Sequence, residues 1–562
     1  MLSWQLHSIV SMRIYCRNNG CLRELPDGVS LEKIYRVMNS PLRYSPMNAV
    51  VNNRVEGLDF RCRRDSAVEF ADCTSPSGMR TYVRSLCFIL AEAVDHLFPQ
   101  AELNIEHSVS KGYYCVINGV GSVRAETVEW IKRRMKRTIL ADVPFRQITG
   151  EGCKVARLFR NRGMEDRARL IETAGLREAT FYAMGTYANF FYGCLTPSSG
   201  YIRQFDLVPY FNGMLLRVPR MQNPRELEIP VKQDKMFGIY RESLRLRRAL
   251  GVNHVADLNR VVAEGRTLQT ILVSEAMQEK QIARIAEAIA LRFREGVRIV
   301  LISGPSSSGK TTFAQRLGIQ LMTELLQPVT VSMDDYFLNR RDTPRNKDGE
   351  YDFESLHALD LPYFNSDMQK LLQGEEIESP SFSFADGTRR YTGKRLRMER
   401  NSVLIVEGIH ALNPALTADI EDARKYRVYV SALTFISMDR HNWIPTTDNR
   451  LLRRIVRDGR FRNYSATETL ARWPGVREGE DRWIFPYQET ADAMFNSAML
   501  YELAALRPLA ETMLADVKEI EPEYAEACRL KRFLAYFTPI SDSDLPPTSL
   551  LREFLGGGSF HY

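Results

Sequence analysis

The amino-acid sequence predicts a multidomain protein that combines α/β and α+β domains. The chain has 562 residues, which is far beyond the size at which a single hydrophobic core keeps growing. From residue 297 to residue 508, apolar strand-like segments alternate with polar, helix-capable stretches, which is typical of a parallel β-sheet flanked by helices. Before residue 226, short alternating strands are mixed with helices, as in α+β domains.

The composition is that of an ordinary folded protein. A net charge of +7 over this length is too small to indicate nucleic-acid binding. The nine cysteines form no CxxC pair, so we expect neither a disulfide framework nor a zinc ribbon, and a reducing cytoplasm fits best. No segment approaches the roughly 18 apolar residues of a membrane helix, and no signal sequence is evident. We therefore expect a cytoplasmic protein without a membrane partner.

The N-terminal part predicts two small domains. Residues 1–11 precede Met12, which opens a strand-like run, so we expect them to be a dispensable extension, or Met12 to be the true start. Residues 12–75 contain two strands, a short helix and two further strands, a ββαββ pattern. Residues 76–225 place two helical runs around a strand at 111–117, which indicates an α+β domain.

A helical connector and the α/β domain complete the chain. In residues 226–296, apolar side chains such as Ile282, Ile285 and Ile289 recur at helical spacing. The parallel α/β domain is expected at 297–508. Residues 509–562 are expected to be a helical segment that ends in a flexible, glycine-rich tail at residues 556–558.

The strongest motif is a phosphate-binding loop at residues 304–311, Gly-Pro-Ser-Ser-Ser-Gly-Lys-Thr. Its glycines allow the backbone N–H groups to turn toward phosphate oxygens, Lys310 supplies a cation, and Thr311 offers a hydroxyl to Mg²⁺. The loop follows a strand and precedes a helical run, so a glycine-serine turn without ligand is the weaker interpretation. The residues predicted to bind ATP or GTP here are Gly304, Ser306, Ser307, Ser308, Gly309, Lys310, Thr311 and Thr312.

Carboxylates follow two later strands of the α/β domain. Asp334 and Asp335 come directly after the strand at 329–332, and Glu407 follows the strand at 402–406. The carboxyl ends of parallel strands are where such sheets bind ligands, and carboxylates serve as Mg²⁺ ligands or as bases. An acidic helix cap and a solvated edge carboxylate are the structural alternatives. The predicted metal ligands are Thr311, Glu407 and Asp334.

An arginine-rich segment covers residues 450–462. Arg453 and Arg457 are four residues apart, so one helix face can present guanidinium groups to phosphates while the segment covers the site as a lid. A solvated helix face and a nucleic-acid patch are the alternatives. The arginines of this segment are Arg450, Arg453, Arg454, Arg457, Arg460 and Arg462.

Together these motifs resemble the uridine kinase and phosphoribulokinase family of P-loop kinases, over residues 297 to 505. The resemblance implies a P-loop NTPase kinase domain with a parallel sheet flanked by helices. It also implies that Asp334 is the catalytic base, with Asp335 as its substitute, and that Lys310, Arg454 and Arg457 assist catalysis. Arg460 and Arg462 would bind the nucleotide.

The acceptor site is implied by the same resemblance. The ribose-binding pair of the family resembles Phe353-Glu354, with a longer carboxylate than usual. The aromatic nucleoside segment resembles residues 380–384, but Gly387 stands where the base-reading His would lie, so the acceptor is nucleoside-like and not necessarily a pyrimidine nucleoside. The implied substrate-binding residues are Asp335, Tyr336, Phe353, Glu354, Phe382, Phe384 and Arg389.

The N-terminal part resembles a different family. Residues 12–75 are similar to the TGS module, a ubiquitin-like β-grasp domain of threonyl-tRNA synthetases, and residues 76–225 to the editing-type domain that follows it. The zinc-binding HxxxH of that domain is replaced by residues 84–88, and its Cys-Gly-Gly-x-His by residues 192–196. The resemblance therefore implies a binding or regulatory platform without zinc-dependent ester hydrolysis on tRNA.

The sequence thus predicts ATP- and Mg²⁺-dependent phosphorylation of a hydroxyl on a nucleoside-like small molecule. Two alternatives stay open: phosphorylation of a sugar phosphate such as ribulose 5-phosphate, and an RNA- or ribosome-associated ATP switch that acts through the TGS-like module. We also expect an assembly of identical chains.

Overall fold

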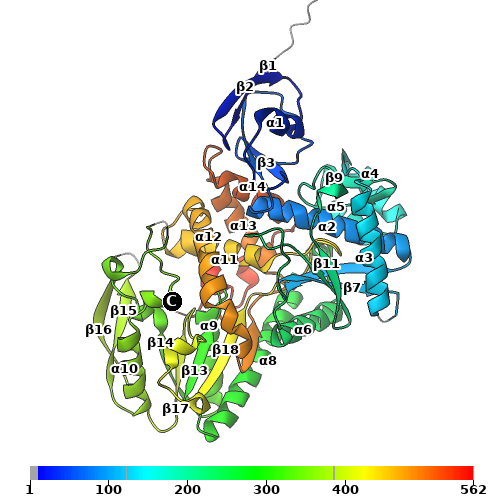
Figure 1. The fold of residues 1–562 in the computed structure, drawn as a ribbon. Coiled ribbons are helices and arrows are strands. Elements are labelled where there is room, and N and C mark those ends of the chain that lie inside the picture. Colours follow the sequence, from blue (N-terminus) through cyan, green and yellow to red (C-terminus); the bar gives the residue numbers. More distant parts are fainter. Residues whose placement is uncertain (1–10, 122, 348, 384–385, 561–562) are drawn as a thin grey trace, which may run out of the picture.

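The computed structural model describes residues 11–560 except residues 122, 348, 384 and 385 (Figure 1). The extension predicted at residues 1–11 lies outside this part apart from Ser11, and the predicted acceptor residue Phe384 also lies outside it. Among the described residues, no helix is both long and apolar enough to cross a membrane.

The first domain is a five-stranded mixed sheet with one helix, at the top of Figure 1. Its elements are β1 (Ser11–Cys16), β2 (Cys21–Pro26), α1 (Leu31–Met38), β3 (Asn48–Val51), β4 (Arg54–Glu56) and β5 (Ser66–Ala71). The strand order is β2-β1-β5-β3-β4, with β1 parallel to β5. Alternate residues of β1 are buried and form one core with Leu31 and Ile34 of α1, because successive side chains of a strand point to opposite faces. This is the predicted β-grasp arrangement.

The second domain is built around the long helix α2, in which fourteen residues are buried. Its elements are α2 (Pro76–Leu97), β6 (Glu102–Val109), β7 (Gly112–Asn118), α3 (Ala125–Leu140), β8 (Arg146–Glu151), α4 (Gly152–Asn161), α5 (Glu165–Thr173), β9 (Glu178–Met184), β10 (Tyr187–Asn189), β11 (Asp206–Tyr210) and β12 (Gly213–Arg217). The strands form two antiparallel sheets, ordered β11-β12-β7-β6 and β10-β9-β8.

Three helices connect this domain to the next: α6 (Asp234–Leu250), α7 (Val255–Ala263) and α8 (Thr267–Arg294). The buried Ile282, Ile285 and Ile289 of α8 belong to the main hydrophobic core, as their helical spacing predicts. That core continues into the parallel sheet, so α8 joins the two parts of the molecule.

The α/β domain is built on a five-stranded, wholly parallel sheet of order β14-β17-β13-β18-β19. Its elements are β13 (Ile299–Ser303), α9 (Lys310–Thr323), β14 (Gln327–Ser332), α10 (Leu361–Leu372), β15 (Ile377–Ser383), β16 (Thr388–Leu396), β17 (Ser402–Glu407), β18 (Lys425–Ser431), α11 (Thr446–Phe461), α12 (Ala466–Trp483) and β19 (Ala493–Asn496). The β15–β16 hairpin and α10 lie together at one side of the domain (Figure 1). Every residue of β13 and β17 is buried, which explains their continuous apolar sequences.

The C-terminal segment corrects one prediction. After α13 (Glu502–Ala515) and α14 (Tyr524–Leu534), the chain forms the short helix α15 (Arg552–Leu555). The predicted flexible tail is wrong, because Arg552 donates a hydrogen bond to the Gly556 carbonyl (3.1 Å) and the Ser559 N–H donates to the Pro547 carbonyl (2.9 Å). Buried apolar residues just before the glycines join the main core, and this burial orders the segment.

A loop of the α/β domain docks onto the second domain. The Ile105 N–H donates to the Arg440 carbonyl (2.8 Å), and the Arg440 N–H donates to Asp166 (2.9 Å). The ring of Trp443 lies 4.4 Å from that of Tyr113.

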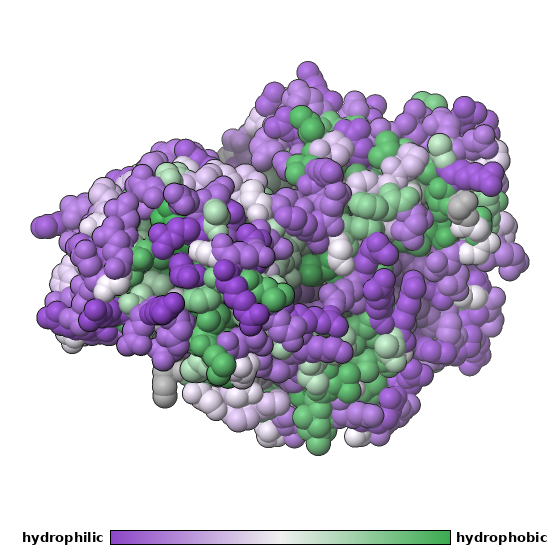
Figure 2. Space-filling view, turned by 90° about the horizontal axis from the view of Figure 1, so that it is seen from below, coloured by the Kyte–Doolittle hydropathy of each residue, from purple (hydrophilic) through white to green (hydrophobic). Residues whose placement is uncertain are grey.

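The molecular face seen from below is mostly hydrophilic, with its apolar residues in separate groups (Figure 2).

The buried His107 predicts a pH-dependent stability. Burial, together with the nearby Arg247, lowers the pKa of His107 to about 4 from its usual 6.5, against the opposing effect of Glu106. Between these values the unfolded chain binds the proton and the folded chain does not, so stability decreases as the pH falls from 6.5 toward 4. At pH 5 the loss is about 2 kcal/mol.

We therefore expect His107→Gln to lose less stability than the unmodified protein between pH 7.5 and pH 5, measured by urea unfolding at both values. The exposed His96 provides the control, and His96→Gln should retain the full pH dependence. If both variants respond to pH like the unmodified protein, His107 is not the group responsible.

Candidate active site

The sheet edge brings the predicted carboxylates toward the phosphate-binding loop. β14 and β17 run parallel, with Ser332 opposite Glu407, and the Ser332 hydroxyl donates to the Glu407 carboxylate (2.8 Å). β13 lies next to β17 and leads into the loop. Because parallel strands end at the same edge, Asp334, Glu407 and Lys310 come together there.

The loop has the backbone conformation that its glycines predict. Gly309 has φ 81° and ends the loop where α9 begins at Lys310, a left-handed conformation that glycine adopts without strain. The N–H groups in the first turn of α9 have no partners within the helix, so they are donors for an anion. The Lys310 side chain is buried and its ammonium donates to the Pro305 carbonyl (3.3 Å).

Charges at this edge influence one another strongly. Burial lowers the pKa of Lys310, while Glu407 and Asp334 oppose that shift. Burial, and then the negative charge of Asp334, raises the pKa of Glu407 to about 7, against the effect of Lys310. Two carboxylates therefore share a buried site with one lysine, and a further cation would stabilise both of them in the charged form.

The donor set fits Mg²⁺. The Thr311 hydroxyl and the carboxylates of Asp334 and Glu407 are hard oxygen donors, as Mg²⁺ requires. Within the residues that the structure describes, no three Asp, Glu, His or Cys side chains form a complete metal site. Mg²⁺ is commonly bound by one or two carboxylates together with substrate phosphates, so these residues would hold the ion jointly with a nucleotide.

The arginines of α11 divide into two groups, which the sequence did not separate. Arg450 and Arg453 are almost completely buried, and both donate hydrogen bonds to carbonyls of the phosphate-binding loop. Arg450 donates to the Ser306 carbonyl (3.1 Å) and to both oxygens of Glu480. Arg453 donates to the Ser307 carbonyl (3.3 Å) and ion-pairs with Glu502 (2.5 Å). These two arginines therefore support the loop structurally.

The other arginines form a crowded cationic group beside Asp334. Arg454 donates to the Ser306 hydroxyl (2.8 Å), and Arg457 ion-pairs with Asp458 (2.8 Å). Arg457, followed by burial, lowers the pKa of Arg462 to about 10, and burial followed by Arg457 lowers that of Arg454. Mutual repulsion of this kind would be relieved by a bound polyanion.

Arg460 is exposed, and a side chain on Gly556 would approach its guanidinium to 3.1 Å. The structure thus places Arg460 beside the C-terminal segment. Its predicted role in nucleotide binding stays a prediction.

Part of the implied acceptor site does come together. The rings of Phe353 and Phe382 each lie near that of Phe337, with centroids 6.3 and 5.6 Å away. Burial raises the pKa of Glu354 to about 7, with Arg454 and Lys310 opposing the shift. An aromatic group and a partly buried carboxyl near Arg454 and Lys310 are therefore present, as an acceptor with a ring and hydroxyl groups would need.

Two predicted acceptor residues instead support the fold. Tyr336 is fully buried and its hydroxyl donates to Asp367 (3.1 Å). Arg389 donates to Asp360 (3.0 Å) and to the carbonyls of Tyr336 and Phe337 (3.1 and 3.0 Å). Neither side chain is available to a ligand in this structure, because both are committed to internal partners.

Asp335 and Gly387 shape the hairpin beside the aromatic group. Asp335 accepts a hydrogen bond from the Phe382 N–H (3.1 Å), so it anchors β15. Gly387 has φ 69°, and a Cβ there would lie 2.7 Å from the side chain of Arg340. The turn therefore requires glycine, which explains physically why no base-reading His stands there.

Sequence reasoning missed two acids next to the phosphate-binding loop, the buried Glu480 and the partly buried Glu553. Glu480 of α12 accepts from the Ser306 N–H (3.2 Å) and from Arg450 and Arg477. Glu553 of α15 accepts from Thr312 at the start of α9. Both lie far along the chain from their partners, in segments without a motif.

In the second domain, Arg84 fills the region of the missing zinc ligands. Its guanidinium donates to the Tyr192 carbonyl (2.9 Å) and to the Thr81 hydroxyl (3.4 Å). A Cβ on Gly193 would collide with that guanidinium. A fixed positive charge in this position opposes binding of Zn²⁺.

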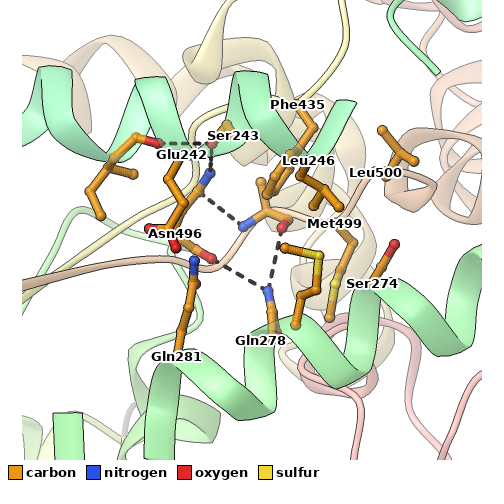
Figure 3. Close-up of a pocket in the computed structure, with 13 residues that line it drawn as sticks. Glu242, Ser243, Leu246, Ser274, Gln278, Gln281, Phe435, Asn496, Met499 and Leu500 are labelled. Atoms are coloured by element: carbon orange, nitrogen blue, oxygen red, sulfur yellow. Dashed lines mark hydrogen bonds between the residues drawn. The ribbon is translucent and has the colours of Figure 1, made fainter. Parts of the chain in front are cut away.

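A separate cavity lies between α6, α8 and the residues that follow β19 (Figure 3). Its polar groups largely bond one another: Gln278 donates to the carbonyls of Asn496 (3.4 Å) and Ala498 (3.3 Å), and Asn496 donates to Ser243 (3.5 Å). None of the sequence-predicted site residues lines it, so the candidate active site is at the sheet edge.

Comparison with known proteins divides the chain in the same way. Residues 299–503 match the model of the Phosphoribulokinase / Uridine kinase family. The chain is 27% identical over 195 residues to a uridine kinase of Lactobacillus helveticus, a match that covers 34% of this chain and 83% of that one.

It is also 26% identical over 263 residues to a threonine–tRNA ligase of Syntrophomonas wolfei, which covers 44% of this chain and 40% of the ligase. The chain thus spans less than half of that ligase, and the similarity concerns the N-terminal part of the present chain. The solved structure of a D-glycerate 3-kinase from Cryptococcus neoformans is 15% identical, with a TM-score of 0.22, over 48% of this chain and 89% of that one.

Proposed function

We propose, from the premise that residues 299–503 are a domain of the phosphoribulokinase and uridine kinase family, that this protein transfers the γ-phosphate of ATP or GTP to a hydroxyl of a nucleoside-like molecule. The observation that carries the proposal is the group of cations around Asp334 and Glu407. Lys310, Arg454 and Arg462 all have lowered pKa values, and a bound triphosphate would offset their positive charges.

The residues have separate tasks in this reaction. The acceptor oxygen attacks the γ-phosphorus, the bond from that phosphorus to the β–γ bridging oxygen breaks, and the acceptor proton passes to Asp334. Lys310, Arg454 and Arg457 offset the charge on the phosphate oxygens as it shifts toward the leaving diphosphate. Thr311 and Glu407, with Asp334 nearby, would hold Mg²⁺ together with the nucleotide, and the ion would supply further positive charge there.

The aromatic group and Glu354 favour a nucleoside-like acceptor. The rings of Phe337, Phe353 and Phe382 offer apolar surface to a planar base. The carboxyl of Glu354 can hydrogen-bond to sugar hydroxyl groups, as the resemblance to uridine kinases implies. A sugar phosphate would use the arginines instead of the rings, and this remains the principal alternative.

An acceptor panel tests the proposal. Purified full-length protein is given Mg-ATP with nucleosides, with ribulose 5-phosphate, or with structured RNA, and ADP release is measured against a control without acceptor. We expect a nucleoside to raise turnover at least tenfold over background, which corresponds to about 1.4 kcal/mol in the barrier.

The other arms of the panel identify the alternatives. If ribulose 5-phosphate supports turnover and no nucleoside does, the acceptor is a sugar phosphate and not a nucleoside. ATP hydrolysis that responds only to RNA would favour the RNA-associated ATP switch. The N-terminal similarity to threonine–tRNA ligases supports this alternative. Phe382→Ala should raise the KM for a nucleoside more than it lowers kcat, because the ring binds the acceptor and not the reacting atoms.

A further inference from the structure

The C-terminal segment, residues 545–559, packs directly against the phosphate-binding loop. The Glu553 carboxylate accepts hydrogen bonds from the Thr312 hydroxyl (2.7 Å) and from the Thr312 N–H (3.3 Å). Leu550 lies so close to Gly309 that a Cβ on the glycine would be 2.5 Å from the leucine side chain. The segment therefore covers the first turn of α9.

The position of this carboxylate matters because of what the first turn of α9 offers. α9 begins at Lys310, so the Thr312 N–H belongs to the first turn, whose N–H groups have no acceptor within the helix and can bind anions. Glu553 occupies that donor with a negative charge, and its charge also acts on the Lys310 ammonium. A carboxylate thus stands where the phosphates of a nucleotide would use the same N–H group.

The segment is held in place by its own contacts. Leu550, Leu551, Phe554 and Leu555 are at most 1% exposed. The Arg453 guanidinium lies over the ring of Phe554, 5.0 Å from its centroid. These buried contacts fix the position of the segment and therefore hold Glu553 next to Thr312.

The preceding helix, α14, links the same region to the N-terminal domains. In the first domain, Arg54 donates to the Tyr524 hydroxyl at the start of α14 (3.1 Å). In the second, Arg80 ion-pairs with Glu526 (2.9 Å). Arg529 forms a two-point ion pair with Asp448 (2.7 and 2.8 Å), which lies in the first turn of the arginine helix α11.

We propose that the C-terminal segment is autoinhibitory: the Glu553 carboxylate competes with nucleotide phosphates for Thr312, and nucleotide binds fully only when Glu553 moves away. The contacts of α14 with both N-terminal domains provide a route by which a ligand of those domains shifts this balance. The inference rests on the proposed function, because it takes the loop to be a nucleotide site.

The test removes the charge and keeps the shape. Glu553→Gln retains an oxygen that accepts from Thr312, whereas the negative charge next to the phosphates is lost. Asp544→Asn is the matched control, since it removes the same charge from an exposed position of the neighbouring chain. Binding of ADP to the full-length proteins is measured by calorimetry, and the two variants are compared with the unmodified protein.

We expect Glu553→Gln to bind ADP about tenfold more tightly, as removal of one close like charge would produce, and Asp544→Asn to bind it unchanged. Equal affinity of Glu553→Gln and the unmodified protein would overturn the autoinhibition and leave the proposed function standing. If neither binds ADP, both proposals fail.

A second measurement uses the unmodified chain and does not depend on the folding of a variant. Hydrogen–deuterium exchange of residues 545–559 should become faster when saturating ATP is added, because nucleotide displaces Glu553 and loosens the segment. Unchanged or slower exchange in a protein that binds ATP would contradict the displacement.

Discussion

Replacing Asp334 with Asn is expected to lower kcat about 10³-fold with the acceptor that the panel identifies. A positioned general base contributes roughly 10² to 10⁴ in rate, and an asparagine amide cannot take the acceptor proton. The residue stands directly after β14, in the turn Met333–Tyr336, and Asn has nearly the same shape, so the turn should keep its conformation. ATP affinity measured without Mg²⁺ should not weaken, because removing a carboxylate beside the phosphates relieves repulsion.

The neighbouring Asp335 provides the matched comparison. Its carboxylate accepts from the Phe382 N–H, and an Asn oxygen can accept the same hydrogen bond. Asp335→Asn is therefore expected to lower kcat less than about tenfold, with any larger change in the KM of the acceptor. Steady-state kinetics of both variants decide the assignment: a greater kcat loss in Asp335→Asn would transfer the role of base to Asp335.

Replacing Glu480 with Leu is expected to destabilise the protein by about 3–5 kcal/mol, which is typical for removing one partner of a buried ion pair. Arg450 and Glu480 are 1% and 0% exposed, respectively, so the variant leaves a guanidinium uncompensated in the interior. The Ser306 N–H loses its acceptor as well. Urea unfolding of the α/β domain, followed by tryptophan fluorescence, measures the effect.

The double variant Arg450→Met with Glu480→Leu is the control. It removes both charges and leaves apolar side chains of similar length, so most of the lost stability should return. Arg477, the other partner of Glu480, is 29% exposed and can turn to water. If the double variant is as unstable as Glu480→Leu, the loss comes from packing, and the ion pair is not its cause.

The main fold and the core of the candidate site could be predicted from local sequence. The phosphate-binding loop is contiguous in sequence, so its backbone conformation and the positions of Lys310 and Thr311 are determined locally. Asp334 and Glu407 could be located because each follows an apolar strand, and parallel strands present their carboxyl ends at one edge.

Residues whose partners are distant could not be assigned in this way. Arg450 and Arg454 have the same side chain and lie on the same helix, yet one supports the loop from the interior and the other reaches the Ser306 hydroxyl. Tyr336 and Arg389 fit the acceptor pattern, but packing commits both to internal partners. The helix face and the neighbours that decide these roles appear only when α11, α12 and the hairpin are packed together.

The sequence by itself therefore determined the phosphate-binding loop, the parallel sheet and the acids at its edge, because these follow from short-range backbone geometry and hydrophobic pattern. Only the tertiary structure decided that Glu553 reaches Thr312 across 241 positions of the chain, and that the glycine-rich end is ordered. Its burial depends on apolar contacts between segments that are remote in sequence, and no local pattern records which segment covers the loop.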